Sequence, residues 1–140
     1  MEVLKQDIKI SSKTAASLGI SFVYLVLLIM AAANHEPFCD ELNVYMAIQH
    51  FDFMGLAKYI FNDGNLPGFY AFSYLPAKIG LPFVSIQVLC AFFSAAAVFL
   101  LLNFSPFPFW FGIGAALSAP LLYFFPIIVR PYSLLPFLIT

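Results

Sequence analysis

The feature that most constrains this chain is its long apolar runs. Residues 15–33 form a continuous apolar run, of about the 20 residues that a helix needs to cross a bilayer. Residues 82–102 and 109–129 form two more runs of similar length. The chain of 140 residues is 63% hydrophobic and 9% charged, so it has too few polar side chains to coat a soluble fold. The sequence therefore predicts an all-α protein with several transmembrane helices.

The charges before the first run predict its orientation. Lys5, Lys9 and Lys13 precede it, and basic residues favour the cytosolic side of a membrane. We therefore expect a cytosolic N-terminus and an outside loop over residues 34–65. A signal peptide cleaved after the alanines at the end of the run is the alternative. The length of the run and the further spans favour an uncleaved first helix.

The outside loop is expected to hold short amphipathic helices. Pro37 prevents the first helix from continuing, and Asp40 is expected to cap a new helix. Residues 53–61 offer a second short helix, which ends at the turn signal of residues 62–65. Two such helices are expected to lie in the membrane interface, and the simpler alternative is that they pack on the spans.

Residues 66–80 leave the topology open between two arrangements. A helix of about fifteen residues reaches about 22 Å, short of a hydrocarbon core about 30 Å thick. If the segment crosses the membrane, Arg130 falls on the cytosolic side. If it is re-entrant, Arg130 lies beside the acids of the outside loop. Residues 133–140 read as the start of an incomplete helix, so we expect these residues to be the N-terminal part of a longer transmembrane domain.

Acidic residues are concentrated in the outside loop. Five of the seven acids lie there: Glu36, Asp40, Glu41, Asp52 and Asp63. Charges this scarce in a membrane protein indicate a functional site. The adjacent Asp40 and Glu41 are the candidate catalytic residues, since one carboxylate can act as a general base while the other binds a substrate hydroxyl or a divalent ion. The simpler interpretation is that both only stabilise the start of a helix.

Three cations beyond the N-terminus are candidates for binding an anionic substrate. They are Lys58, Lys78 and Arg130, and a protein that handles an anionic lipid head group needs such groups. The planar fork of Arg130 suits a phosphate. An arginine in this place can also simply extend its charged end to the interface.

Several other kinds of site are not expected. His35 and Glu36 match no spacing typical of metal ligands, so we assign no metal ligands and leave a divalent cation open as a cofactor. Cys39 lies beside the acids and Cys90 inside an apolar run, so a disulfide between them is not expected. The net charge of −1 and the lack of a basic cluster argue against a nucleic-acid partner.

Three stretches of the chain, taken in order, resemble one known family. They are Pro37-Phe38-Cys39-Asp40-Glu41, Asp63-Gly64-Asn65-Leu66-Pro67-Gly68-Phe69-Tyr70 and Arg130-Pro131-Tyr132-Ser133-Leu134-Leu135. They resemble the first-loop Asp-Glu motif, the Gly/His/Pro/aromatic segment and the Arg-x-Tyr segment of membrane glycosyltransferases with the GT-C fold. The nearest branch is the protein mannosyltransferase and lipid A aminoarabinose transferase group. Leu66-Pro67-Gly68 stands where that family has His-Pro-Pro.

The resemblance implies a sugar transferase of the bacterial cytoplasmic membrane. Its donor would be a polyprenyl-phosphate-linked sugar, and its acceptor a glycan, lipid or protein on the outer face. Asp40 would be the base in an inverting attack that displaces the lipid phosphate, with Glu41 assisting. Arg130 and Tyr132 would bind the donor, with Lys58 and Lys78 as further substrate-binding candidates.

The resemblance also bears on topology and on the alternatives. A donor phosphate on the outer face needs a cation there, which favours the arrangement with Arg130 outside. Family members are several times longer, so these residues alone are expected to be inactive. The alternative is a non-catalytic multi-pass membrane protein, such as a transporter subunit or an assembly factor, because proline-broken helices also bind substrates in transporters.

Overall fold

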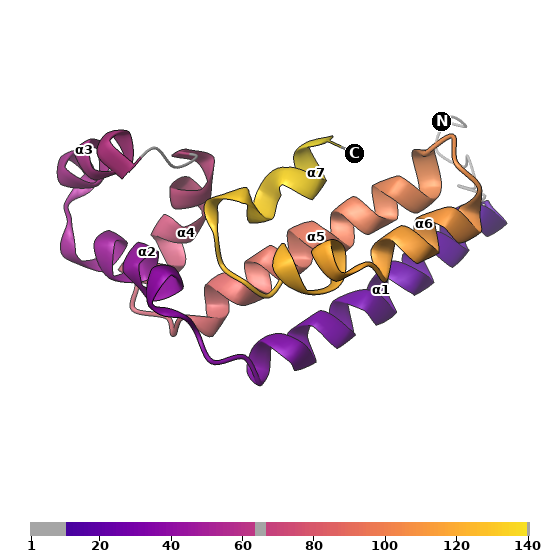
Figure 1. Cartoon of the computed structure of the whole chain (residues 1–140), viewed down its shortest axis with the longest axis horizontal. Coiled ribbons are helices and arrows are strands. Elements are labelled where there is room, and N and C mark those ends of the chain that lie inside the picture. Colours follow the sequence, from indigo (N-terminus) through magenta and orange to yellow (C-terminus); the bar gives the residue numbers. More distant parts are fainter. Residues whose placement is uncertain (1–10, 64–66, 140) are drawn as a thin grey trace, which may run out of the picture.

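The computed structural model describes residues 11–63 and 67–139, and over these residues the chain is helical without strands (Figure 1). The expected all-α class is therefore confirmed. Lys5, Lys9, residues 64–66 of the expected turn and family segment, and Thr140 lie outside the described residues. In chain order the elements are α1 (Ser12–Ala33), α2 (Cys39–His50), α3 (Phe53–Asp63), α4 (Pro67–Lys78), α5 (Val84–Phe104), α6 (Phe109–Ala116), the π-helix η1 (Pro120–Phe124), the 3-10 helix η2 (Pro131–Leu134) and α7 (Leu135–Ile139).

Two long helices, α1 and α5, form the body of the molecule. They run antiparallel, as Figure 1 shows, and the hydroxyl of Thr14 near the start of α1 donates to Asn103 Oδ1 near the end of α5 at 3.0 Å. Within the described residues, only these two helices are long and apolar enough to cross a membrane. The sequence predicted both to within three residues at each end.

Small side chains let α1 and α5 approach closely. Ala91, Ala95 and Val98 of α5 are buried, as are Tyr24 and Leu28 of α1. Short side chains at a helix interface permit the close backbone contact on which helix association in lipid depends. The outer face of α1 is different, because Phe22, Val23 and Met30 are all exposed there.

The short helices α2, α3 and α4 gather at one end of this body, where α1 ends and α5 begins (Figure 1). Their shared core includes Val44, Ile48, Leu56, Phe69 and Tyr70. The expected short helices of the loop are therefore present as α2 and α3. The 12 residues of α4 give a helix of about 18 Å, which is too short to cross a bilayer core.

The run over residues 109–129 is not one kinked helix. It divides into α6, which ends at Ala116, and η1, followed by residues without regular helix up to Arg130. Two prolines explain the break, because neither Pro120 nor Pro126 has an N–H to donate to the preceding turn. Ser118 adds a local alternative bond, since its hydroxyl donates to the Ala115 carbonyl at 2.6 Å. The break brings residues 127–130 back to the end where α2 begins.

Candidate functional site

The site forms around the first turn of α2. The helix begins at Cys39 with Phe38 as its N-cap, so Asp40 lies inside the first turn and the expected Asp40 cap is wrong. Glu41 occupies the third helical position, and its Oε2 accepts from the Phe38 N–H at 2.7 Å. A glutamate at this position bonds back to the cap residue in the capping box. The carboxylate one position later than expected therefore stabilises the helix start.

Glu41 is fully buried and its carboxylate joins three parts of the chain. Its Oε1 accepts from the Val129 N–H at 2.6 Å. Its Oε2 also lies 3.1 Å from His35 Nε2, in addition to the Phe38 bond. Charge-assisted bonds of this kind are short and about twice as strong as neutral ones. The buried carboxylate thus has partners on both oxygens.

Asp40 and Arg130 form an ion pair at the surface beside this buried network. Arg130 Nη2 lies 3.2 Å from Asp40 Oδ2, although the two residues are 90 positions apart. The Asp40 side chain is 70% exposed and the Arg130 side chain 38%. An exposed pair of this kind contributes little to stability, about 0–1 kcal/mol. The ion pair therefore contributes little to folding, and its interest lies in placing a carboxylate and a guanidinium side by side at the surface.

The backbone around Arg130 is fixed by Ser133. The Arg130 N–H donates to Ser133 Oγ at 3.1 Å, and the Ser133 hydroxyl donates to the Ile128 carbonyl at 2.9 Å. Ser133 is buried. Its hydroxyl therefore serves the Arg130 N–H and the Ile128 carbonyl in a segment where the backbone is not a regular helix. The serine therefore shapes the turn from which the Arg130 side chain extends to Asp40.

Not all N–H donors of the Arg130 guanidinium are hydrogen-bonded. Its Nε is enclosed, and none of the described residues accepts a hydrogen bond from it. A guanidinium presents five N–H donors in a fork that matches a phosphate or a carboxylate. The enclosed Nε cannot reach a substrate, but the Arg130 side chain is 38% exposed. An exposed carboxylate beside the accessible part of a guanidinium can accept a proton while the guanidinium binds an anionic group.

The two lysines that were predicted to bind substrate lie outside this site. Lys78 Nζ donates to the Phe51 and Gln49 carbonyls at 2.8 and 3.3 Å, so it binds the C-terminal end of α2. Asp40 is at the opposite end of that helix, about 14 Å away by helical rise. Lys58 is exposed on α3. Tyr132 belongs to η2, and its side chain lies outside the part that the structure describes.

The described polar residues of the loop were also compared with the requirements of a metal site. Among the described residues, no group of three or more His, Cys, Asp and Glu side chains could hold a metal ion. Asp52 instead accepts from the Gly55 N–H at 2.7 Å at the start of α3, as a capping residue does. Cys39 is exposed and Cys90 is buried, and both are free thiols in this structure.

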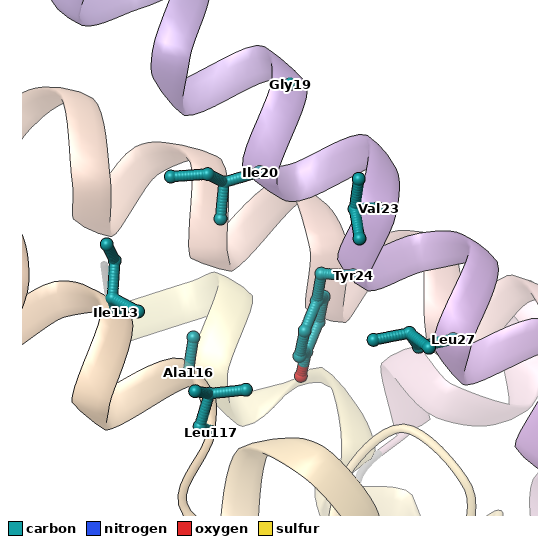
Figure 2. Close-up of a pocket in the computed structure, with 8 residues that line it drawn as sticks. All are labelled: Gly19, Ile20, Val23, Tyr24, Leu27, Ile113, Ala116 and Leu117. Atoms are coloured by element: carbon teal, nitrogen blue, oxygen red, sulfur yellow. The ribbon is translucent and has the colours of Figure 1, made fainter.

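A separate groove lies between α1 and α6 and is shown in Figure 2. It has a volume of about 230 Å³, and it is lined by Gly19, Ile20, Val23, Tyr24, Leu27, Ile113, Ala116 and Leu117. The Tyr24 hydroxyl donates to the Leu121 carbonyl, so the one polar group of the lining is already bonded. The groove has the chemistry of a hydrocarbon site, and none of the predicted site residues lines it.

Sequence reasoning missed two members of the buried network. His35 was considered as a metal ligand, and the Val129 N–H carries no signal at all because every residue except proline has one. The bond from Val129 depends on the break after Ala116, which returns residues 127–130 to α2. Comparisons with protein-family models, curated proteins and solved structures found no match to this chain.

Proposed function

We propose that this chain takes part in sugar transfer from a polyprenyl-phosphate donor at the outer face of a membrane. In this proposal Asp40 is the general base that deprotonates the acceptor hydroxyl, and Arg130 binds the donor phosphate. The sugar passes to the acceptor by an inverting displacement of the lipid phosphate. The family resemblance of the three stretches motivates the assignment.

One observation carries the proposal. The Asp40 carboxylate and the Arg130 guanidinium meet at 3.2 Å, although they come from segments 90 residues apart and belong to two of the three stretches. A base and an anion-binding group are needed side by side for a displacement at a phosphate-linked sugar, because holding the reacting groups together removes much of the entropic barrier. The exposure of Asp40 leaves it open to an acceptor.

The arrangement of the helices supports a polytopic topology with this pair outside. In the proposal α1 crosses outward and α5 crosses back, while α2, α3 and α4 stay at the outer end as interfacial helices. The broken segment over residues 109–129 then returns Arg130 to the outer face. The lysines before α1 favour a cytosolic N-terminus, because basic residues are enriched on the cytosolic side of membranes.

The decisive experiment replaces Asp40 with Asn in the longer protein of which these residues are expected to be a part, held in membranes, and measures transfer of a labelled sugar from a polyprenyl phosphate. Loss of a general base lowers transfer by about 10²- to 10⁴-fold. Glu36→Gln is the matched control, because Glu36 is an exposed acid of the same loop and should leave transfer unchanged.

The alternative function makes the opposite prediction. A non-catalytic membrane component would tolerate Asp40→Asn as well as Glu36→Gln in any assay of its own activity. Undiminished sugar transfer by the Asp40→Asn protein would rule out Asp40 as the base. A longer protein that is correctly inserted and shows no transfer with any polyprenyl-phosphate sugar would favour the non-catalytic role.

A further inference from the structure

The ion pair at the surface lies directly beside a buried hydrogen bond. Asp40 precedes Glu41 in the chain, and Arg130 follows Val129. Glu41 Oε1 accepts from the Val129 N–H at 2.6 Å, and the Arg130 guanidinium reaches Asp40 at 3.2 Å. The two partners of the ion pair are thus the chain neighbours of the two partners of the buried bond.

Glu41 is poorly placed to react with a substrate. Its side chain has no exposed surface. One oxygen bonds to Val129, and the other contacts both Phe38 and His35. A group that transfers a proton to or from a substrate must come within hydrogen-bonding reach of it. The side chain of Asp40 meets that requirement, and the side chain of Glu41 does not.

We infer that Glu41 is a positioning residue, whose carboxylate fastens residues 128–130 to the first turn of α2 and so sets where the Arg130 guanidinium stands relative to Asp40. Nothing else that the structure describes bonds the Val129 N–H. The fastening itself does not depend on the reaction. Its value for donor binding rests on the proposed function.

The test compares Glu41→Gln with two controls by amide hydrogen exchange in lipid nanodiscs. A glutamine has a similar shape but only one acceptor oxygen, so either the Val129 or the Phe38 N–H loses its acceptor. The exchange rate of whichever of these two amides loses its acceptor should rise by about tenfold or more. This rise corresponds to the loss of one hydrogen bond to a charged group. Asp40→Asn and Glu36→Gln leave both acceptors in place and should not raise it.

A second readout separates positioning from a purely structural role. Binding of a polyprenyl phosphate to the same nanodiscs should weaken in Glu41→Gln although Arg130 is intact. Where transfer is measurable, Glu41→Gln should raise KM for the donor more than it lowers kcat, and Asp40→Asn should do the reverse.

Each outcome decides one claim. Unchanged exchange at Val129 and Phe38 would overturn the inference. So would loss of the helical circular-dichroism signal in Glu41→Gln, since Glu41 would then be needed for the whole fold rather than for this local contact. Raised exchange supports the fastening, even if the unmodified protein binds no polyprenyl phosphate, a result that would count against the proposed function alone.

Discussion

The region around Glu41 and the body formed by α1 and α5 are stabilised by different interactions. Where α1 ends, a buried carboxylate bonds two backbone N–H groups and contacts a histidine. Along the rest of α1 and α5, the buried apolar contacts include Leu28, Ala91, Ala95 and Val98, and the Thr14–Asn103 bond joins the two helices at their far end. The first region depends on hydrogen bonds in fixed directions, and the second depends on packing.

The difference indicates which region needs its side chains held in fixed positions. Packed apolar helices tolerate small shifts, because dispersion contacts have no strong direction. A buried charge does not, because each unpaired donor or acceptor is costly in a low-dielectric interior. The chain therefore places its directional bonds beside Asp40 and Arg130, and the α1–α5 body serves to hold that end together.

Replacing Glu41 with Ala should have the largest effect on stability. The substitution removes an acceptor from the buried Phe38 and Val129 N–H groups and leaves a cavity. Leaving a buried donor without its partner costs about 1–3 kcal/mol for each group, and two N–H groups are affected here. Unfolding in mixed micelles, followed by circular dichroism, measures this loss.

Asp40→Ala is the matched control for that measurement. The Asp40 side chain is mostly exposed, so its removal should change the free energy of unfolding by about 1 kcal/mol or less. Equal losses in the free energy of unfolding would mean that the buried Glu41 carboxylate contributes no more to stability than the exposed Asp40 side chain does. The contrast between the two regions would then be wrong.

Sequence patterns predicted the body of the molecule better than its end. The bounds of α1 and α5 follow from apolar length and from local signals such as Pro37, and these are properties of neighbouring residues. The contact between Arg130 and Asp40 was expected only from the resemblance and from one of two open topologies. It depends on α4 being short and on the break at Pro120, so no local pattern could establish it.

The roles of the adjacent acids show a second limit of sequence reasoning. Asp40 and Glu41 differ by one position along α2, which turns their side chains about 100° apart. One is exposed and the other fully buried. Which acid faces inward depends on the residue at which the helix begins. A local pattern locates that residue only to within one or two positions, and one position separates the two acids.

Within the packed body, Leu28→Ala should have an intermediate effect. Leu28 is 1% exposed, and such a truncation costs about 2–5 kcal/mol in a water-soluble core. If α1 crosses a membrane as proposed, the surrounding lipid is as apolar as the interior, so mainly the packing contacts are lost. We expect a loss near the lower limit, measured by the same unfolding assay.

Leu18→Ala supplies the control for the packed body, because Leu18 is 49% exposed on the same helix. Its removal should leave stability nearly unchanged. If both leucines mattered equally, the exposed face of α1 would be covered by something other than lipid. That result would change the assignment of the α1 surface without touching the buried network around Glu41.

The smallest expected effect belongs to the polar bond at the opposite end of the body. The Thr14 hydroxyl donates to Asn103 Oδ1 at 3.0 Å, and side-chain bonds between membrane helices average about 0.6 kcal/mol in double-mutant cycles. The cycle uses Thr14→Val, Asn103→Leu and the double variant in the unfolding assay. A coupling of this size would mean that the bond only adds to the packing. A coupling as large as the loss in Glu41→Ala would mean that directional polar bonds hold both ends of the helix pair, and the contrast between the two regions would disappear.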